Sequence, residues 1–128
     1  MFLPHKSDNG LQPFEYYPAA AGTYEIGQLL SVTDGKLTAI TEASKTTPAY
    51  VSMGQGALAD GDVLPVIRVN HEMIFETTLS AEAANAKLGS LLEVSAGGKQ
   101  VDAANAGTFE VVYIEGTAAD SIVHGRFK

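Results

Sequence analysis

Short runs of β-forming residues, each followed by a turn signal, recur from Thr23 to the end of the chain. Residues 23–32 and 36–40 are the first two runs, and Asp34-Gly35 lies between them. Asp-Gly at this place predicts a β-hairpin, because a type I′ turn needs positive φ at both central residues. Further runs occupy residues 49–53, 63–69, 73–78, 91–94, 99–101, 108–115 and 121–127. The pattern predicts an all-β domain over residues 23–128, either a small β-barrel or a β-sandwich.

Two segments of this domain depart from simple β patterning. Pro65 removes a backbone donor from the run 63–69, which predicts a strand at a sheet edge or one with a bulge. The alanine-rich residues 81–88 predict one short helix, with Ser80 as its cap and Gly89 at its end. A helix this short is unstable alone, so we expect it to pack on the sheet.

A weak internal repeat links two parts of the chain. Gly27-Gln-Leu-Leu-Ser-Val-Thr-Asp-Gly-Lys36 resembles Gly89-Ser-Leu-Leu-Glu-Val-Ser-Ala-Gly-Gly-Lys99, with one residue inserted. Stable solenoids need about three or more repeats, so two copies do not indicate that architecture. The repeat predicts two similar hairpins within one domain.

The first 22 residues have a different composition from the rest. They contain three of the five prolines, and proline restricts both its own φ and the conformation of the preceding residue. We therefore expect residues 1–22 to form an extended N-terminal arm. This arm either folds back over its own domain or docks on a neighbouring protein. Its candidate contact residues are Leu3, Leu11, Phe14, Tyr16 and Tyr17.

Composition excludes several classes of protein. The 128 residues fit one domain, and 8 basic against 15 acidic residues give a net charge of −7, so we expect no nucleic-acid partner. No apolar stretch approaches the roughly 18 residues of a membrane helix, and the N-terminus lacks the features of a secretory signal. The absence of cysteine excludes disulfides and thiolate metal sites, and it is compatible with a cytosolic origin.

No sequence motif indicates catalysis or ligand binding. The histidines His5, His71 and His124 lie far apart without metal-ligand spacing. Gly54-Gln-Gly56-Ala-Leu-Ala59 has the letters of a dinucleotide fingerprint, but Asp60-Gly61-Asp62 interrupts the chain where that motif needs a helix. We therefore expect no enzyme activity, no catalytic residues, no cofactor and no metal site.

Several phrases of the sequence, read together, resemble one protein family. They are Pro13-Phe-Glu-Tyr-Tyr-Pro-Ala-Ala-Ala-Gly22, Tyr24-Glu-Ile-Gly-Gln-Leu-Leu30, Asp34-Gly-Lys-Leu37, Thr47-Pro-Ala-Tyr-Val51, Gly61-Asp-Val-Leu-Pro-Val-Ile-Arg-Val69 and Ile74-Phe-Glu-Thr-Thr-Leu-Ser80. Over most of residues 13–127 the chain resembles the small head-decoration (capsid cement) proteins of tailed bacteriophages and prophages. The resemblance rests on β patterning and these phrases, and not on a catalytic signature.

The resemblance implies a structural virion protein that binds the outside of the phage capsid and stabilises it. It implies a homotrimer bound to the major capsid protein on the virion surface, assembled in the host cytoplasm, with no catalytic residues. Two alternatives stay open: another virion component, such as a head fibre base or a head-completion or tail protein, and a β-sandwich module that binds a glycan or other ligand. We also expect a chain without residues 1–22 to fold and to lose binding to expanded capsids.

Overall fold

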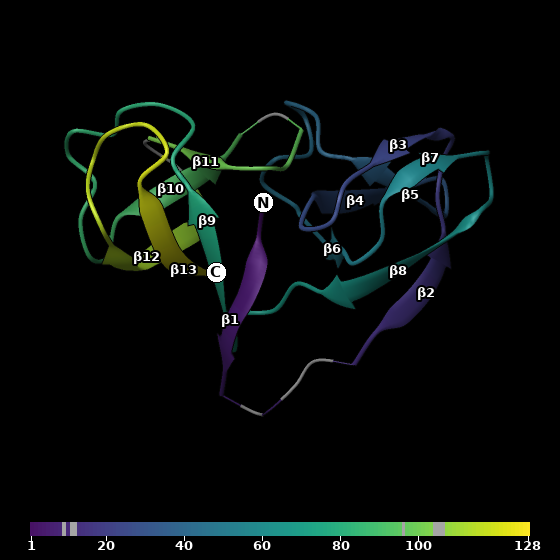
Figure 1. The fold of residues 1–128 in the computed structure, drawn as a ribbon, viewed down its shortest axis with the longest axis horizontal. Helices are drawn as coiled ribbons and strands as arrows, with labels where there is room; N and C mark the ends of the chain where they lie inside the picture. Colours follow the sequence, from purple (N-terminus) through teal and green to yellow (C-terminus); the bar gives the residue numbers. More distant parts are fainter. Residues whose placement is uncertain (9, 11–12, 96, 104–106) are drawn as a thin grey trace.

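The computed structural model describes residues 1–8, 10, 13–95, 97–103 and 107–128, and the regular structure of these residues is all β. Neighbouring strands in its three sheets are antiparallel throughout. Figure 1 shows the two larger sheets side by side. This arrangement confirms the predicted all-β class. The described residues contain no helix that is long and apolar enough to cross a membrane.

The two larger sheets contain six and five strands. The six-stranded sheet has the order β1 (Leu3–Ser7), β9 (Met73–Thr78), β13 (Ile122–Phe127), β12 (Phe109–Ile114), β10 (Leu91–Val94) and β11 (Val101–Asp102). The five-stranded sheet has the order β2 (Glu15–Pro18), β8 (Val63–Arg68), β6 (Tyr50–Ser52), β4 (Leu29–Thr33) and β5 (Lys36–Ala39). A two-stranded ribbon pairs β3 (Gly22–Tyr24) with β7 (Gly56–Leu58).

The two larger sheets share one hydrophobic core. Buried side chains from both sheets pack together there, among them Phe2, Leu29, Val51, Ile67, Phe75, Phe109 and Phe127. A second cluster lies on the other face of the five-stranded sheet and includes Leu30, Leu37, Leu64 and Val66. Adjacent residues in a strand point to opposite faces, so Leu29 and Leu30 join different clusters. This packing of sheets fits a β-sandwich.

One five-stranded topology occurs twice in these sheets. The first unit contains β2, β4, β5, β6 and β8, in the sheet order β2-β8-β6-β4-β5. The second unit contains β9 to β13, in the order β9-β13-β12-β10-β11. In both units the first strand lies beside the fifth, and the second and third strands form a hairpin at the other end. β1 is additional and extends the second unit beyond β9.

Backbone contacts show that the two units correspond in detail. A parallel bridge joins the residue after the first strand to the third strand, Ala19 to Leu37 in one unit and Leu79 to Val101 in the other. Gly27 and Gly89 precede the second strands, with φ of 80° and 86°. The internal repeat of the sequence therefore marks the hairpin of each unit, as predicted. The structural correspondence extends well beyond the hairpins, to all five strands.

The two local strand predictions have different outcomes. The Asp34-Gly35 hairpin is confirmed, since it joins β4 to β5 with φ of 51° and 77° at these residues. The edge or bulge at Pro65 is wrong, because β8 lies between β2 and β6 and pairs with β2 in regular register. The Pro65 carbonyl accepts a hydrogen bond from Met53 N–H at 2.8 Å, one residue after β6 ends. In an antiparallel sheet the N–H and the C=O of one residue point toward the same neighbouring strand, so the N–H that Pro65 lacks would also point toward the β6 side. There it would meet the chain just after β6 has ended, and β6 itself needs no donor from Pro65.

The predicted helix over residues 81–88 is wrong. These residues form turns, in which Ala86 N–H donates to the carbonyl of Ala83, three residues earlier, at 2.9 Å. Ala83 N–H donates to the Thr117 carbonyl at 2.8 Å, and Gly89 N–H donates to the Val111 carbonyl at 2.9 Å. A short helix gains little stability from its own hydrogen bonds, so bonds to other segments of the second unit determine this backbone.

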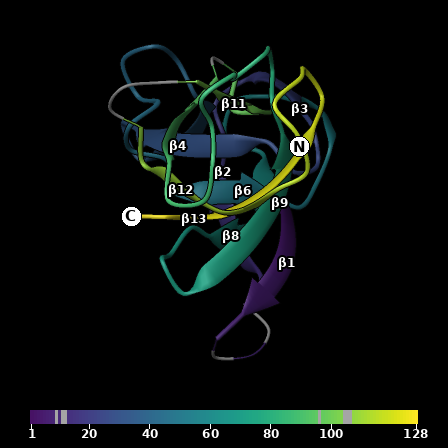
Figure 2. The same cartoon turned by 90° about the vertical axis from the view of Figure 1, so that its left-hand side faces the viewer.

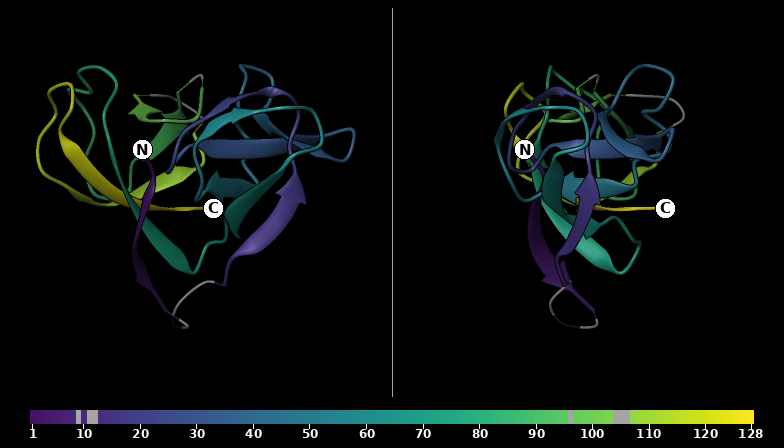
Figure 3. Two further views of the ribbon diagram at one scale, coloured as in Figure 1. Left: turned by 45° about the vertical axis from the view of Figure 1, so that its right-hand side comes forward. Right: turned by 90° about the vertical axis from the view of Figure 1, so that its right-hand side faces the viewer.

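In the described part of residues 1–22, two strands, β1 and β2, pair within this chain with one large sheet each. β1 pairs with β9 along the edge of the six-stranded sheet, and β2 pairs with β8 in the five-stranded sheet. Figures 1 and 3 show the two strands diverging, one along each sheet. Phe2, immediately before β1, is fully buried in the shared core. The N-terminal segment therefore contributes directly to the hydrophobic core.

Candidate functional site

The predicted contact residues occupy different environments. Phe14 and Tyr16 are exposed, with 53% and 65% of their surface accessible, and Leu3 on β1 is 39% exposed. Tyr17 is half-buried and packs against the second hydrophobic cluster. Leu11 lies outside the described residues. The structure thus brings Phe14 and Tyr16 together at β2, and it puts Leu3 on the other sheet.

Phe14 and Tyr16 belong to an exposed apolar surface. Side chains alternate along a strand, so Tyr16 and Pro18 face the same side of β2, and Phe14 immediately precedes the strand. Tyr16 is paired with Pro65, and Pro18 is paired with Val63, which is 58% exposed. The β2 surface is defined here by Phe14, Tyr16, Pro18 and Val63. Exposed aromatic residues of this kind are enriched at protein interfaces.

Polar contacts on the opposite side of β2 hold this strand on β8. Arg68 Nη2 and Nε donate to the two carboxylate oxygens of Glu15, at 2.7 and 3.2 Å. The Tyr17 hydroxyl donates to Glu15 Oε1 at 2.6 Å, and the Arg68 guanidinium lies 5.1 Å from the centre of the Tyr50 ring. The bonds from Arg68 and Tyr17 lower the pKa of Glu15, and the bond to Glu15 raises the pKa of Tyr17 to about 12. These contacts hold β2 on β8 from the side of the strand opposite Tyr16.

β2 is the last strand of its sheet, and its outer edge differs from that of β9 in the second unit. Ala19 N–H and Leu79 N–H make equivalent hydrogen bonds to the turn before the fifth strand, so residue 19 aligns with residue 79. Residues 13–16 therefore correspond to residues 73–76, which pair with β1. Among the described residues, no strand lies beside β2 where β1 lies beside β9. An uncovered strand edge is a site where another chain can pair.

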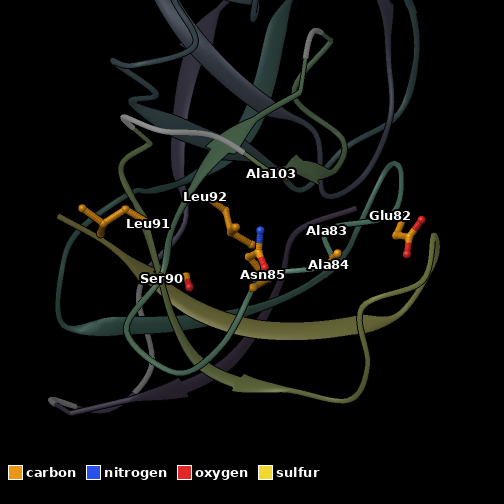
Figure 4. A pocket seen from close by; sticks show the side chains of 9 residues that line it. Glu82, Ala83, Ala84, Asn85, Ser90, Leu91, Leu92 and Ala103 are labelled. Carbon is orange, nitrogen blue, oxygen red and sulfur yellow. The ribbon is translucent and has the colours of Figure 1, made fainter.

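A shallow hollow of about 450 Å³ lies between the turns at residues 82–86 and β10 (Figure 4). Its lining is mostly alanine and leucine, and Glu82 is the one titratable side chain among the described lining residues. The Ser90 hydroxyl accepts a hydrogen bond from Lys87 N–H at 3.0 Å, and Figure 4 shows Ser90 well separated from Glu82. This lining therefore offers no nucleophile and base in contact.

A group of polar side chains lies on the six-stranded sheet. His124 Nε2 lies 2.9 Å from Glu76 Oε2, and the ring centroids of His5 and His124 are 4.0 Å apart. One ligand atom from each of these three residues lies within 4.8 Å of the other two. His71, in the turn before β9, is not part of this group. The three members are distant in sequence and meet only through the strand order β1-β9-β13, so their spacing along the chain contains no signal of the group.

In comparisons with known proteins, no protein-family model and no curated protein matches this chain.

Proposed function

We propose that this protein is a structural virion protein that binds the outside of a tailed-phage capsid and stabilises it. We assign the contact with the major capsid protein to the β2 surface. The resemblance in sequence supplies the class of partner, and it also supplies the expected homotrimer and the location on the virion. The observation that supports the β2 surface is the exposure of Phe14 and Tyr16 on an uncovered strand edge.

Strand addition explains how such an edge would bind its partner. An extended capsid segment beside residues 13–16 would take the place that β1 takes beside β9 in the second unit. Backbone hydrogen bonds would provide affinity, and contacts to Phe14 and Tyr16 would provide specificity. On the outer edge Pro18 lacks a backbone donor and Ala20 N–H already donates to the Leu37 carbonyl, so pairing is confined to a short stretch.

The net charge of the protein and the several contacts of a trimer are both compatible with many copies bound on one capsid. The net charge of −7 favours solubility of the free protein. A short strand edge gives each contact only modest affinity. A trimer that touches several capsid subunits gains overall affinity, because later contacts form at a high effective concentration. Dense decoration therefore does not require a large interface for each copy.

Binding to expanded heads tests this proposal. Heads are assembled from the major capsid protein of the same genome, and the bound copies are counted after sedimentation. We expect saturable binding in hundreds of copies for the wild type. The double variant Phe14→Ser/Tyr16→Ser should lose at least about tenfold in affinity, because interface hot spots contribute about 2 kcal/mol or more. Tyr113→Ser is the matched control, since it removes an aromatic side chain that is 52% exposed in the second unit.

Each outcome of this assay has a defined meaning. A wild-type chain that does not bind expanded heads would refute the capsid role. Full occupancy by the double variant would refute the assignment to the β2 surface. Binding of only a few copies per head would favour a portal-proximal component, and binding to a glycan array without binding to heads would favour a ligand-binding module.

A further inference from the structure

Figure 2 shows the strands β1, β9 and β13, which are neighbours in the six-stranded sheet. These strands bring His5, Glu76 and His124 to one place. Glu76 is the direct cross-strand partner of His124. On β1 the register with β9 shifts between Pro4 and Lys6, so His5 is the additional residue of an irregular stretch. An irregularity of this kind redirects a side chain, and here the His5 ring lies against the ring of His124.

We propose that these three residues bind one divalent transition-metal ion, represented here by Zn²⁺. Two imidazoles and one carboxylate form a donor set that suits Zn²⁺ and its first-row neighbours, with water in the remaining positions. With metal–ligand bonds of about 2.0–2.1 Å, the ligand atoms of a tetrahedral site lie about 3.3 Å apart. His124 Nε2 and Glu76 Oε2, at 2.9 Å, are therefore within about half an ångström of that separation.

The hydrophobic core fixes the backbone at two of the three ligands. Phe75 and Val123, the residues before Glu76 and His124, are both fully buried. The side chains of Glu76 and His124 are 37% and 16% exposed, whereas His5 is exposed. Two ligands are thus held in place before metal binding, and the third lies on the side that faces solvent.

A hydrogen bond between Glu76 and His124 alone accounts for only part of this arrangement. A cross-strand contact between Glu76 and His124 needs no third group. His5, with its ring 4.0 Å from that of His124, adds a second imidazole beside the same carboxylate. A bound metal ion uses all three side chains, and it links β1 to β9 and β13.

Calorimetric titration of the full chain, without a histidine tag, with ZnCl₂ in metal-free buffer tests this site. We expect one Zn²⁺ per chain and at least about a tenfold loss of affinity in each of His5→Ala, Glu76→Gln and His124→Ala. His71→Ala is the matched control, because it removes the remaining histidine and should leave Zn²⁺ affinity unchanged. Visible absorption of bound Co²⁺ provides a second measurement, and the three ligand variants should each lose it.

Three results would overturn the proposal. The first is the absence of saturable Zn²⁺ binding to the wild type. The second is unchanged affinity in His5→Ala, because the hydrogen bond between Glu76 and His124 then explains the group. The third is loss of binding in His71→Ala, which would put the metal elsewhere. Circular dichroism without metal checks the fold of each variant, and if His124→Ala misfolds, the variant of the exposed His5 still decides the question.

Discussion

Truncation of Phe2 to alanine is predicted to destabilise the protein strongly, although this residue is the second in the chain. Its side chain is fully buried, and its ring centroid lies 5.7 Å from that of Phe109 and 5.9 Å from that of Phe127. Its N–H donates to the Gly27 carbonyl at 2.7 Å. Phe2 thus joins the N-terminus both to the core strands of the second unit and to the start of the hairpin in the first.

The expected loss of stability follows from burial. Truncation of a buried phenylalanine costs about 3–5 kcal/mol. That range includes the loss of ring contacts, such as the edge-to-face pair of Phe2 and Phe109 at 79°. Since a domain is stable by about 5–15 kcal/mol, Phe2→Ala removes a large fraction of the free energy of unfolding. At about 4 °C per kcal/mol, the melting temperature should fall by about 12–20 °C.

Denaturant and thermal unfolding, followed by circular dichroism, measure this effect. Phe14→Ala is the matched control, because it truncates the same side chain in the same N-terminal segment at a position that is 53% exposed. The control should cost less than about 1 kcal/mol. Small and equal effects of the two substitutions would refute the packing of Phe2 in the core.

The same reasoning changes the expectation for a chain without residues 1–22. The sequence predicts that this truncated chain folds. The structure predicts that it does not fold, because the truncation removes Phe2 from the core together with all of β1 and β2. A cooperative unfolding transition in the truncated chain would refute this second prediction and would show that residues 23–128 fold alone.

Two further predictions concern a pair of glycines and a tyrosine hydroxyl. Gly89→Ala should lower the free energy of unfolding by about 1–2 kcal/mol, which is the strain of a left-handed backbone. No steric clash adds to this cost, because no atom beyond its chain neighbours lies within 4 Å of an added Cβ. Gly27→Ala, at the corresponding position, should cost more, because its Cβ would lie 3.1 and 3.2 Å from the backbone N and O of Phe2; equal unfolding midpoints for the two variants would contradict this. The raised pKa of Tyr17 means that its bond to the ionised Glu15 carboxylate contributes its full stabilisation up to about pH 10, the unfolded-state pKa of tyrosine, and is lost as pH rises through about 12. The tyrosinate absorbance that disappears in Tyr17→Phe should therefore titrate near pH 12 and move lower in Glu15→Gln, and a wild-type midpoint near 10 would argue against the contact.

The features of the fold that could be predicted from the sequence depend on neighbouring residues. Asp34-Gly35 determines its own turn through two positive φ angles. Met73–Thr78 alternates regularly between buried and half-buried residues, as a strand with one face in the core should. The helix prediction failed because the backbone of Ala83 bonds to Thr117, which is distant in sequence. Local propensity contains no information about such a partner.

In the candidate sites, too, some features follow from neighbouring residues and others depend on residues distant in sequence. An aromatic cluster in a proline-rich segment identified Phe14 and Tyr16, but the pairing of β2 with β8 decides that they are exposed while Tyr17 packs inward. Phe2, which is fully buried, was not selected by the same reasoning. The histidine group could not be predicted at all, because its members are joined by the order of strands in the sheet and by an irregular register at His5.

The duplicated topology explains why the two candidate sites differ in chemistry. Tyr16 pairs with Pro65 at the place where Glu76 pairs with His124 in the second unit. The first and fifth strands thus present an apolar pair in one unit and a hydrogen-bonded polar pair in the other. β1 covers the second unit's edge and adds His5, whereas no described strand covers the equivalent edge of the first unit. Because the two sites use different units, the aromatic double variant should keep its Zn²⁺ affinity, and His5→Ala should keep its head binding. A variant that lost both activities while staying folded would show that the two units are coupled.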